Sequence, residues 1–109
     1  MMIKVSVLYP SGAGRFDVDY YLDVHMPLSI ARLGPSMRRI EVEIGVAGAA
    51  PGLPPAHIAM AHFVCESADA FIAAFMPHAA ELQGDMANYT DIEPIIQFSE
   101  IRIATPEPA

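Results

Sequence analysis

The segment from His57 to Cys65 has apolar side chains on both of its faces, and no other feature of the sequence constrains the fold more. Alternate residues of a strand point to opposite sides of its sheet. One side of this strand holds Ile58, Met60 and Val64, and the other holds Ala59, Ala61, Phe63 and Cys65. Strands of this kind are normally covered on both sides. The fold must therefore provide a covering layer for each face of the sheet.

Three more strands and two helices are predicted around this segment. Asp17 and Ser67 stand where the two helices begin, and their side chains can accept hydrogen bonds from the first backbone N–H groups. The spacing of apolar residues predicts strands over 3–9, 40–46, 57–65 and 95–103, with helices over 17–34 and 67–87. The predicted order is therefore β-α-β-β-α-β.

This order is typical of an α+β, ferredoxin-like fold with a four-stranded antiparallel sheet. Right-handed crossovers place both helices on one face of that sheet. The other face has no cover within the chain, although the strands at 57–65 and 95–103 carry apolar side chains on both of their faces. A second copy of the chain is the simplest cover, so we predict a homodimer that forms through the open face of the sheet.

One domain over residues 1–104 accounts for nearly all of the 109 residues. The Gly/Pro-rich stretch 47–56 is predicted to be a flexible or variable loop. Residues 105–109 are predicted to form a flexible C-terminal tail.

The composition excludes several classes of partner. The net charge is −7, from 13 acidic and 6 basic side chains, which opposes binding to nucleic acid or to an anionic membrane. No apolar run reaches the roughly 20 residues that cross a bilayer, and the N-terminus lacks the features of a signal peptide. Cys65 is the only cysteine, so no disulfide can form within the chain. We expect a cytoplasmic protein.

His25 is the first candidate for chemistry. It lies on the apolar stripe of the first predicted helix, and Tyr21 lies four residues earlier on the same face. Pro27 cannot donate to the carbonyl of Asp23, so the helix should kink or restart beside His25. An imidazole can exchange a proton near neutral pH, which suits general acid–base catalysis. The alternative is a buried histidine that bonds only to the backbone.

His62 is the second candidate, in the middle of a predicted strand. Among apolar neighbours its imidazole needs a polar partner. If His62 faces the helices it lines the same pocket as His25, and otherwise it belongs to the dimer interface; we predict the pocket. The apolar wall of that pocket is expected to include Met26, Leu28, Met60 and Phe75.

No metal site or cofactor is predicted. His57 and His62 are an odd number of residues apart, so they leave their strand on opposite faces. The sequence contains no HExxH or CxxC pair. Cys65 lies at the end of a strand without an obvious base, which is typical of a small buried apolar residue.

Several motifs together resemble the EthD-like family, which is named for ethyl tert-butyl ether degradation. The most specific is Tyr20-Tyr21 followed by His25-Met26-Pro27-Leu28. The others are Val5-Ser6-Val7-Leu8-Tyr9-Pro10, Phe16-Asp17-Val18-Asp19, Ala74-Phe75-Met76-Pro77-His78-Ala79 and Asn88-Tyr89-Thr90-Asp91-Ile92-Glu93-Pro94. The resemblance covers most of the chain and implies a dimeric α/β-barrel in which two sheets pack face to face. Relatives with that barrel include muconolactone isomerases, polyketide cyclases, antibiotic-biosynthesis monooxygenases and haem-degrading enzymes, many of which use no organic cofactor.

Two functions compete. The first is a cofactor-free enzyme of a catabolic pathway that acts on a small apolar oxygenated or aromatic compound, by isomerisation, cyclisation or dehydration, or in a monooxygenase-like way. His25 would be its general acid and base, Tyr21 would orient His25, and His62 would donate a second proton or stabilise an oxyanion. The alternative is a non-catalytic accessory protein that binds a pathway intermediate, and a purely structural dimer is a third reading.

Overall fold

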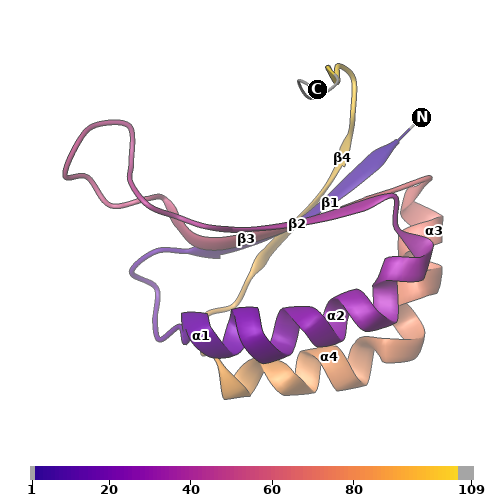
Figure 1. Cartoon of the computed structure of the whole chain (residues 1–109), viewed down its shortest axis with the longest axis horizontal. Coiled ribbons are helices and arrows are strands. Elements are labelled where there is room, and N and C mark those ends of the chain that lie inside the picture. The colour runs from indigo at the N-terminus through magenta and orange to yellow at the C-terminus, as the bar shows by residue number, and fades with distance from the viewer. Residues whose placement is uncertain (1, 106–109) are drawn as a thin grey trace.

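The computed structural model describes residues 2–105, which form a sheet with helices on one of its faces (Figure 1). The sheet is antiparallel and has the strand order β2-β3-β1-β4. Its strands are β1 (Ile3–Pro10), β2 (Arg39–Ile44), β3 (His57–Cys65) and β4 (Ile95–Glu100). This is the predicted α+β ferredoxin-like arrangement with β-α-β-β-α-β order.

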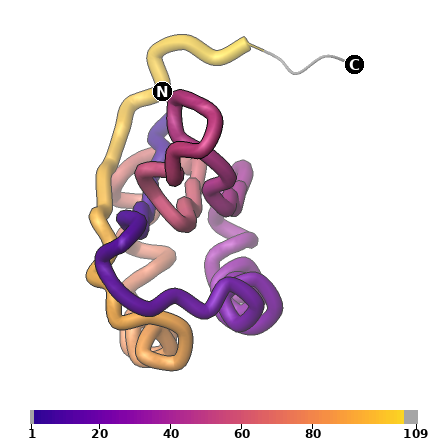
Figure 2. Tube along the Cα trace, turned by 90° about the vertical axis from the view of Figure 1, so that its left-hand side faces the viewer, coloured from indigo at the N-terminus to yellow at the C-terminus, as the bar shows by residue number. Residues whose placement is uncertain are grey.

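Two helical units lie side by side beneath the sheet (Figure 2). The first consists of α1 (Val18–Tyr20), the π-helical turn η1 (Tyr21–His25), α2 (Met26–Leu33) and η2 (Gly34–Ser36). The second consists of α3 (Ala68–Phe75), η3 (Met76–His78), α4 (Ala79–Asp85) and η4 (Met86–Asn88). No helix in the described part of the chain is long and apolar enough to cross a membrane.

Both predicted helix caps are confirmed. The Asp17 carboxylate accepts a hydrogen bond from the backbone N–H of Tyr20 at 3.1 Å. The Ser67 hydroxyl accepts from the backbone N–H of Ala70 at 3.0 Å. Each cap satisfies one of the donors that a helix start leaves without an intrahelical partner.

The interruption expected near Pro27 takes the form of a π-helical turn. The N–H of Met26 bonds to the carbonyl of Tyr21, five residues earlier, and Pro27 then stands in the first turn of α2. This wide turn contains more residues than the 3.6 of an α-helical turn. The positions that face the sheet after it are therefore shifted toward the C-terminus, relative to a regular helix. The buried positions after it are Met26, Ser29 and Leu33. Leu28, which continues a regular stripe from His25, is only half-buried.

The two faces of β3 differ in their cover. Ala59, Ala61, Phe63 and Cys65 are at most 5% exposed and pack toward the helices, with Val5 and Tyr9 of β1 beside them. The other set includes Met60 and His62, which lie on the face that no helix covers. Pleating alone explains this division, because the two sets alternate along the strand.

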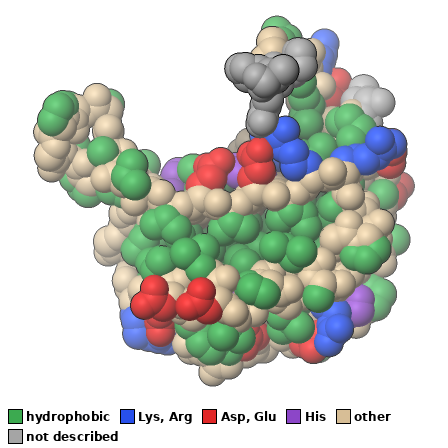
Figure 3. All heavy atoms as spheres, in the orientation of Figure 1, with side chains coloured by type: hydrophobic (Ala, Val, Ile, Leu, Met, Phe, Trp, Pro, Cys, Tyr) green, Lys and Arg blue, Asp and Glu red, His purple; other side chains and the backbone are tan. Residues whose placement is uncertain are grey.

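The open face of the sheet carries polar as well as apolar side chains. Arg39, Glu41 and Glu43 of β2 point to it, and Figure 3 shows acidic and basic groups along the rim above β2. Near the middle, the Ser6 hydroxyl lies 2.8 Å from Nδ1 of His62. Half-buried apolar residues of β1 and β3 share this face: Leu8, Ile58, Met60 and Val64.

Two segments differ from a simple sheet-and-helix body. The loop between β2 and β3 extends away from the rest of the molecule (Figure 1), and its Val46 is 92% exposed. β4 ends at Glu100 and so is three residues shorter than the predicted strand, with Ile103 88% exposed beyond it. Residues 106–109 of the predicted tail lie outside the described residues.

Candidate active site

A cavity of about 510 Å³ lies between the sheet and the helical units. Its walls are mainly apolar. Ile72 of α3 and Ile96 and Phe98 of β4 line it and are 47%, 57% and 43% exposed, so the cavity opens to solvent between α3 and β4. The side chains deeper inside come from β1, β3 and both helical units: Val5, Val7, Tyr9, Tyr21, His25, Met26, Ser29, Leu33, Ala61, Phe63 and Leu82. A cavity of this size and lining suits a small apolar molecule with a few polar atoms.

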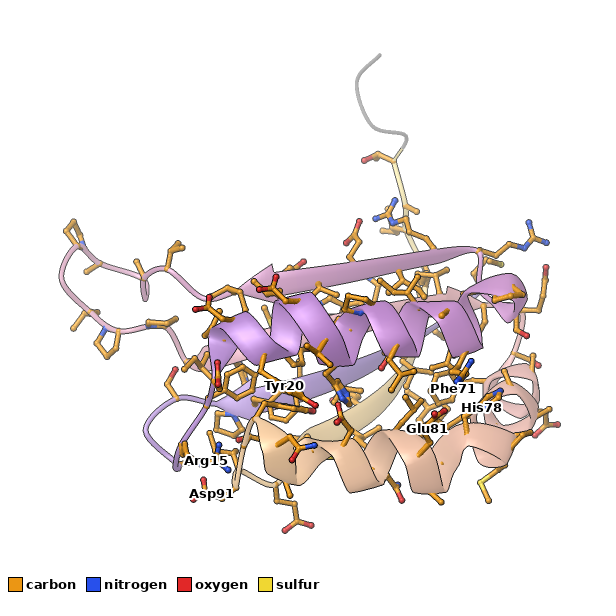
Figure 4. All side chains as sticks on the ribbon, turned by 60° about the horizontal axis from the view of Figure 1, so that its bottom comes forward. Arg15, Tyr20, Phe71, His78, Glu81 and Asp91 are labelled. Carbon is orange, nitrogen blue, oxygen red and sulfur yellow. The ribbon has the colours of Figure 1, made fainter. Side chains whose placement is uncertain are left out.

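Asp85, at the end of α4, is held by three hydrogen-bond donors. The Tyr20 hydroxyl donates to Oδ1 at 2.7 Å, Asn88 Nδ2 donates to Oδ1 at 3.0 Å, and Nδ1 of His25 lies 2.9 Å from Oδ2. Burial opposes the charge, but the bonds from Tyr20, Asn88 and His25 outweigh it and lower the pKa of Asp85 below its usual value near 3.8. Figure 4 shows Tyr20 between the two helical units, where it links them through Asp85.

The charge on Asp85 fixes the tautomer of His25. An ionised carboxylate can only accept a hydrogen bond, so Nδ1 of the neutral imidazole carries the proton. Nε2 then has a free lone pair, and no group within residues 2–105 forms a hydrogen bond with it. The His25 side chain is 8% exposed and lines the cavity. Nε2 is therefore placed to take a proton from a bound molecule.

The backbone around His25 is held as firmly as its ring. The Ser29 hydroxyl donates to the carbonyl oxygen of His25 at 3.0 Å, which gives that carbonyl a partner beside the wide turn. The ring packs against Tyr89 with a centroid distance of 4.5 Å and stacks on Tyr21 at 6.0 Å. At the surface of the molecule, Nε of Arg32 in α2 lies 2.8 Å from Oε1 of Glu81 in α4 and forms an ion pair with it (Figure 4 labels Glu81). These contacts keep the two helical units in one arrangement around the cavity.

Two buried tyrosines, Tyr21 and Tyr89, contact the His25 ring, and a third, Tyr9, contacts both of them. The hydroxyls of Tyr9 and Tyr89 lie 2.7 Å apart and share a hydrogen bond. The Tyr21 hydroxyl is buried and has no hydrogen-bond partner within the described residues. Burial raises the pKa of Tyr9, Tyr21 and Tyr89, and the neighbouring Tyr9 hydroxyl raises that of Tyr21 further. All three therefore remain neutral hydrogen-bond donors at neutral pH.

The structure brings together only some of the residues that the sequence predicted for the site. His25, Tyr21, Met26 and Phe75 line one cavity. The prediction for Leu28 is wrong because the wide turn rotates it away from the cavity wall. The prediction for Met60 is wrong because Met60 lies on the open face of the sheet, on the side of β3 away from the cavity.

His62 also lies on the open face, so the prediction that it shares a pocket with His25 is corrected. Its Nδ1 lies 2.8 Å from the Ser6 hydroxyl, and its Nε2 lies 3.5 Å from Glu43. Ser6 and Glu41 pair with His62 across β1 and β2, and residues that pair directly point to the same side of a sheet. The sheet itself separates His62 from His25.

The sequence did not single out four residues of the site: Tyr9, Tyr20, Asp85 and Tyr89. A local signal existed for Asp85, because it lies three residues after Leu82 and so continues the apolar stripe of the second helix. A carboxylate at that position is a natural partner for a buried histidine. Which histidine it meets depends on how the two helical units pack, and no spacing within either unit contains that information.

Other chemistries find little support in the described part of the chain. Within residues 2–105 no three His, Cys, Asp or Glu side chains are placed to hold one metal ion. Cys65 is fully buried, its thiol donates to the carbonyl of Ser67, and burial raises the pKa of that thiol. A thiol with a raised pKa is a poor nucleophile at neutral pH.

Known protein families and solved structures include close matches to this chain. The sequence profile of the EthD domain family matches residues 15–93. The crystal structure of an EthD-like protein from Ralstonia eutropha JMP134 is similar, with 51% identity, 95% of each chain covered and a TM-score of 0.87. Comparison with functionally curated proteins gives no match.

Two more distant crystal structures share the fold. An ethyl tert-butyl ether degradation (EthD) family protein from Bacillus halodurans C-125 is 18% identical, over 93% of this chain and 99% of that one, with a TM-score of 0.66. A dimeric protein of unknown function and ferredoxin-like fold from Bacteroides fragilis NCTC 9343 is 17% identical, over 92% and 96%, with a TM-score of 0.59.

Proposed function

The chain belongs to the EthD domain family, and from this premise we propose that it is an enzyme that carries out acid–base chemistry on a small, largely apolar, oxygen-containing compound of a catabolic pathway. The chemistry is of the kind that the chain's own side chains supply. Proton removal from carbon, followed by its return to another atom, accounts for isomerisation, cyclisation and dehydration alike.

The observation that carries the proposal is the hydrogen bond between His25 and the Asp85 carboxylate at the wall of an apolar cavity. The carboxylate of Asp85 lies 2.9 Å from Nδ1 and leaves Nε2 of this cavity-lining residue available to a bound molecule. A carboxylate that orients an imidazole also stabilises the positive charge that the ring gains when it accepts a proton. His25 is thus the proposed catalytic residue, and Asp85 is its positioning residue.

Tyr20 and Asn88 support this pair from outside the cavity. Both donate to the carboxylate oxygen that His25 does not use, so the carboxylate is fixed at both ends. Tyr21, which the sequence proposed as the orienter of His25, makes a ring contact with it but no hydrogen bond. The orienting role therefore passes to Asp85 in this proposal.

The test is a turnover screen in D₂O. The protein is incubated with a panel of neutral apolar ketones, lactones, ethers and phenols, and ¹H NMR follows deuterium incorporation and new products. We expect turnover of at least one class, and its loss in a folded His25→Gln variant. Binding without turnover would favour the accessory-protein alternative, and full turnover by a folded His25→Ala variant would remove the assignment of His25.

We also propose that two copies pair through the open face of the sheet. Leu8, Ile58, Met60 and Val64 supply apolar surface there, and no element within residues 2–105 covers it. The polar groups at its centre, Ser6 and His62, are bonded to each other and so can be buried without losing their partners. The Bacteroides fragilis protein, which shares the fold, is described as dimeric.

A further inference from the structure

The Tyr21 hydroxyl is a hydrogen-bond donor without an acceptor. The residue is 1% exposed, and its oxygen has no partner within the described residues. Burying a hydroxyl in this way costs free energy, and native structures rarely accept that cost without a reason. Tyr21 lines the cavity beside His25, so a molecule in the cavity is placed to supply the acceptor.

The pair formed by Tyr9 and Tyr89 offers a second donor. Two hydroxyls carry two protons, but the bond between them at 2.7 Å uses only one. Tyr89 is fully buried behind the cavity wall, whereas Tyr9 lines the cavity. When Tyr89 donates to Tyr9, the Tyr9 proton is free to point into the cavity. The Tyr9 and Tyr21 rings lie beside each other, edge to face, with their centroids 5.8 Å apart.

We propose that the Tyr9 and Tyr21 hydroxyls form a binding site for one carbonyl oxygen, and that the substrate is a neutral apolar ketone with a C–H bond next to that carbonyl. This inference rests on the proposed role of His25 and names the substrate class of the same site. A carbonyl oxygen has two lone pairs and can accept from both hydroxyls at once. An ether or an alcohol would also bind there, but only a carbonyl makes the neighbouring C–H bond acidic.

The charges around the site select against anions. Asp85 is ionised behind His25, and Glu93 lines the cavity. The rest of the wall is largely apolar, and none of the Lys and Arg residues in the described part of the chain lines the cavity. A carboxylate substrate would lose its hydration without gaining a cation, which disfavours its binding. A neutral ketone loses little hydration free energy and gains two hydrogen-bond donors.

The proposed reaction uses His25 as the base and the Tyr9 and Tyr21 hydroxyls as the carbonyl-binding group. Nε2 of His25 removes the proton from the carbon next to the carbonyl. The electron pair of that C–H bond forms a C=C bond, and the carbonyl electrons move onto oxygen, where the Tyr9 and Tyr21 hydroxyls stabilise the enolate. In a β,γ-unsaturated ketone the enolate extends over the neighbouring C=C bond, so the His25 imidazolium returns the proton to the γ-carbon and the double bond moves into conjugation with the carbonyl, without any other reactant. Tyrosines whose pKa is raised by burial remain protonated and can serve as such donors.

The test uses 1-tetralone, a neutral bicyclic ketone, labelled with ¹³C at its carbonyl, and tetralin, the hydrocarbon without the oxygen. Binding of each is measured by NMR titration, and the carbonyl ¹³C shift of bound 1-tetralone is recorded. We expect 1-tetralone to bind more tightly than tetralin, with its carbonyl resonance moved downfield. Tyr21→Phe should weaken 1-tetralone binding roughly threefold to tenfold, reduce that downfield shift and leave tetralin binding unchanged.

Ser99→Ala is the control, because it removes a hydroxyl that accepts a hydrogen bond from Gln97 on β4 and does not line the cavity. It should leave the carbonyl shift unchanged. The proposal is overturned if 1-tetralone binds no better than tetralin, including no binding of either, or if Tyr21→Phe weakens both ligands equally. Exchange of the 1-tetralone α-protons with D₂O reports on His25 separately. If the wild-type protein shows the carbonyl shift but no exchange, the proposed carbonyl site stands and the proposed catalytic role of His25 is contradicted.

Discussion

Nδ1 of His25 lies 2.9 Å from Oδ2 of Asp85, although the two residues are 60 positions apart in the chain. His25 ends the π-helical turn of the first helical unit, and Asp85 ends α4 of the second. The contact therefore exists only when both units are packed beneath the same face of the sheet. The same carboxylate thus has two roles: it links the two helical units, and it sets the tautomer of the imidazole.

Asp85→Asn should lower kcat and leave KM nearly unchanged. The amide can no longer stabilise the imidazolium, so we expect a loss on the order of 10²-fold in kcat for the substrate found in the turnover screen. The pH profile of kcat should move as well, which a purely structural residue would not cause. Asp91→Asn is the matched control. Asp91 accepts a hydrogen bond from the backbone N–H of Arg15 in the loop after β1 (Figure 4), and this bond involves neither Asp85 nor His25. Equal losses in both variants would contradict a specific role for Asp85.

Stability should depend on the charge of Asp85 at acid pH. Its hydrogen bonds lower the pKa in the folded state, so the folded protein holds this proton less tightly than the unfolded chain. The stabilisation is fully present above the usual carboxyl pKa near 3.8 and disappears as the pH falls through the lower, native value. Denaturant unfolding of the wild type and Asp85→Asn should therefore show a constant difference above about pH 5 that narrows below pH 4. A difference that grows on acidification would reverse the assigned sign.

Gly45 should tolerate no side chain, whereas Gly84 should accept one. A Cβ on Gly45 would collide with the backbone carbonyl of His57 and lie 2.7 Å from Cβ of Pro55. We expect Gly45→Ala to lower the free energy of unfolding by about 1–3 kcal/mol. Gly84 lies in α4, and beyond its chain neighbours and its own helix backbone no atom comes within 4 Å of the added Cβ, so Gly84→Ala should be neutral or stabilise by up to about 1 kcal/mol. Thermal unfolding of the two variants side by side checks both expectations.

Met60→Lys should separate the proposed dimer into monomers. The charge would be placed in the middle of the open face, where burial against a second copy would strip its hydration. Ile30→Lys is the control, because Ile30 is 44% exposed on α2, on the opposite side of the molecule. Sedimentation equilibrium should give a dimer for the wild type and Ile30→Lys and a monomer for Met60→Lys. A monomeric wild type at micromolar concentration would exclude the open face as a self-association surface.

The fold was largely predictable because its signals are local. Asp17 and Ser67 each cap a helix through a bond to a residue three positions away, and alternation along β3 divides its side chains correctly between two faces. The site was predictable only in part. Tyr21 and His25 share one helical stripe, but the packing of two units decides that Asp85 meets His25.

The face of His62 illustrates the limit most clearly. Alternation shows that His62 and Phe63 point to opposite faces of the sheet. Because β3 is apolar on both faces, its sequence does not show which face is covered by the helices. The charged residues of β2 would have marked the outer side, because Glu41 pairs directly with His62. That pairing register depends on the long loop between β2 and β3, and its length does not specify a register. Leu28 was misplaced for a different reason, since a regular 3.6-residue period does not anticipate the wide turn at residues 21–25.

The most direct test of the account is the tautomer of His25, read from the ¹⁵N chemical shifts of its imidazole in the neutral form. We predict a proton on Nδ1, bonded to Asp85, and an unprotonated Nε2 whose ¹⁵N resonance shifts when a ligand enters the cavity, while the His62 resonances stay unchanged. A proton on Nε2 of neutral His25, or a cavity ligand that leaves its resonances unmoved, would contradict the assignment of His25 as the base.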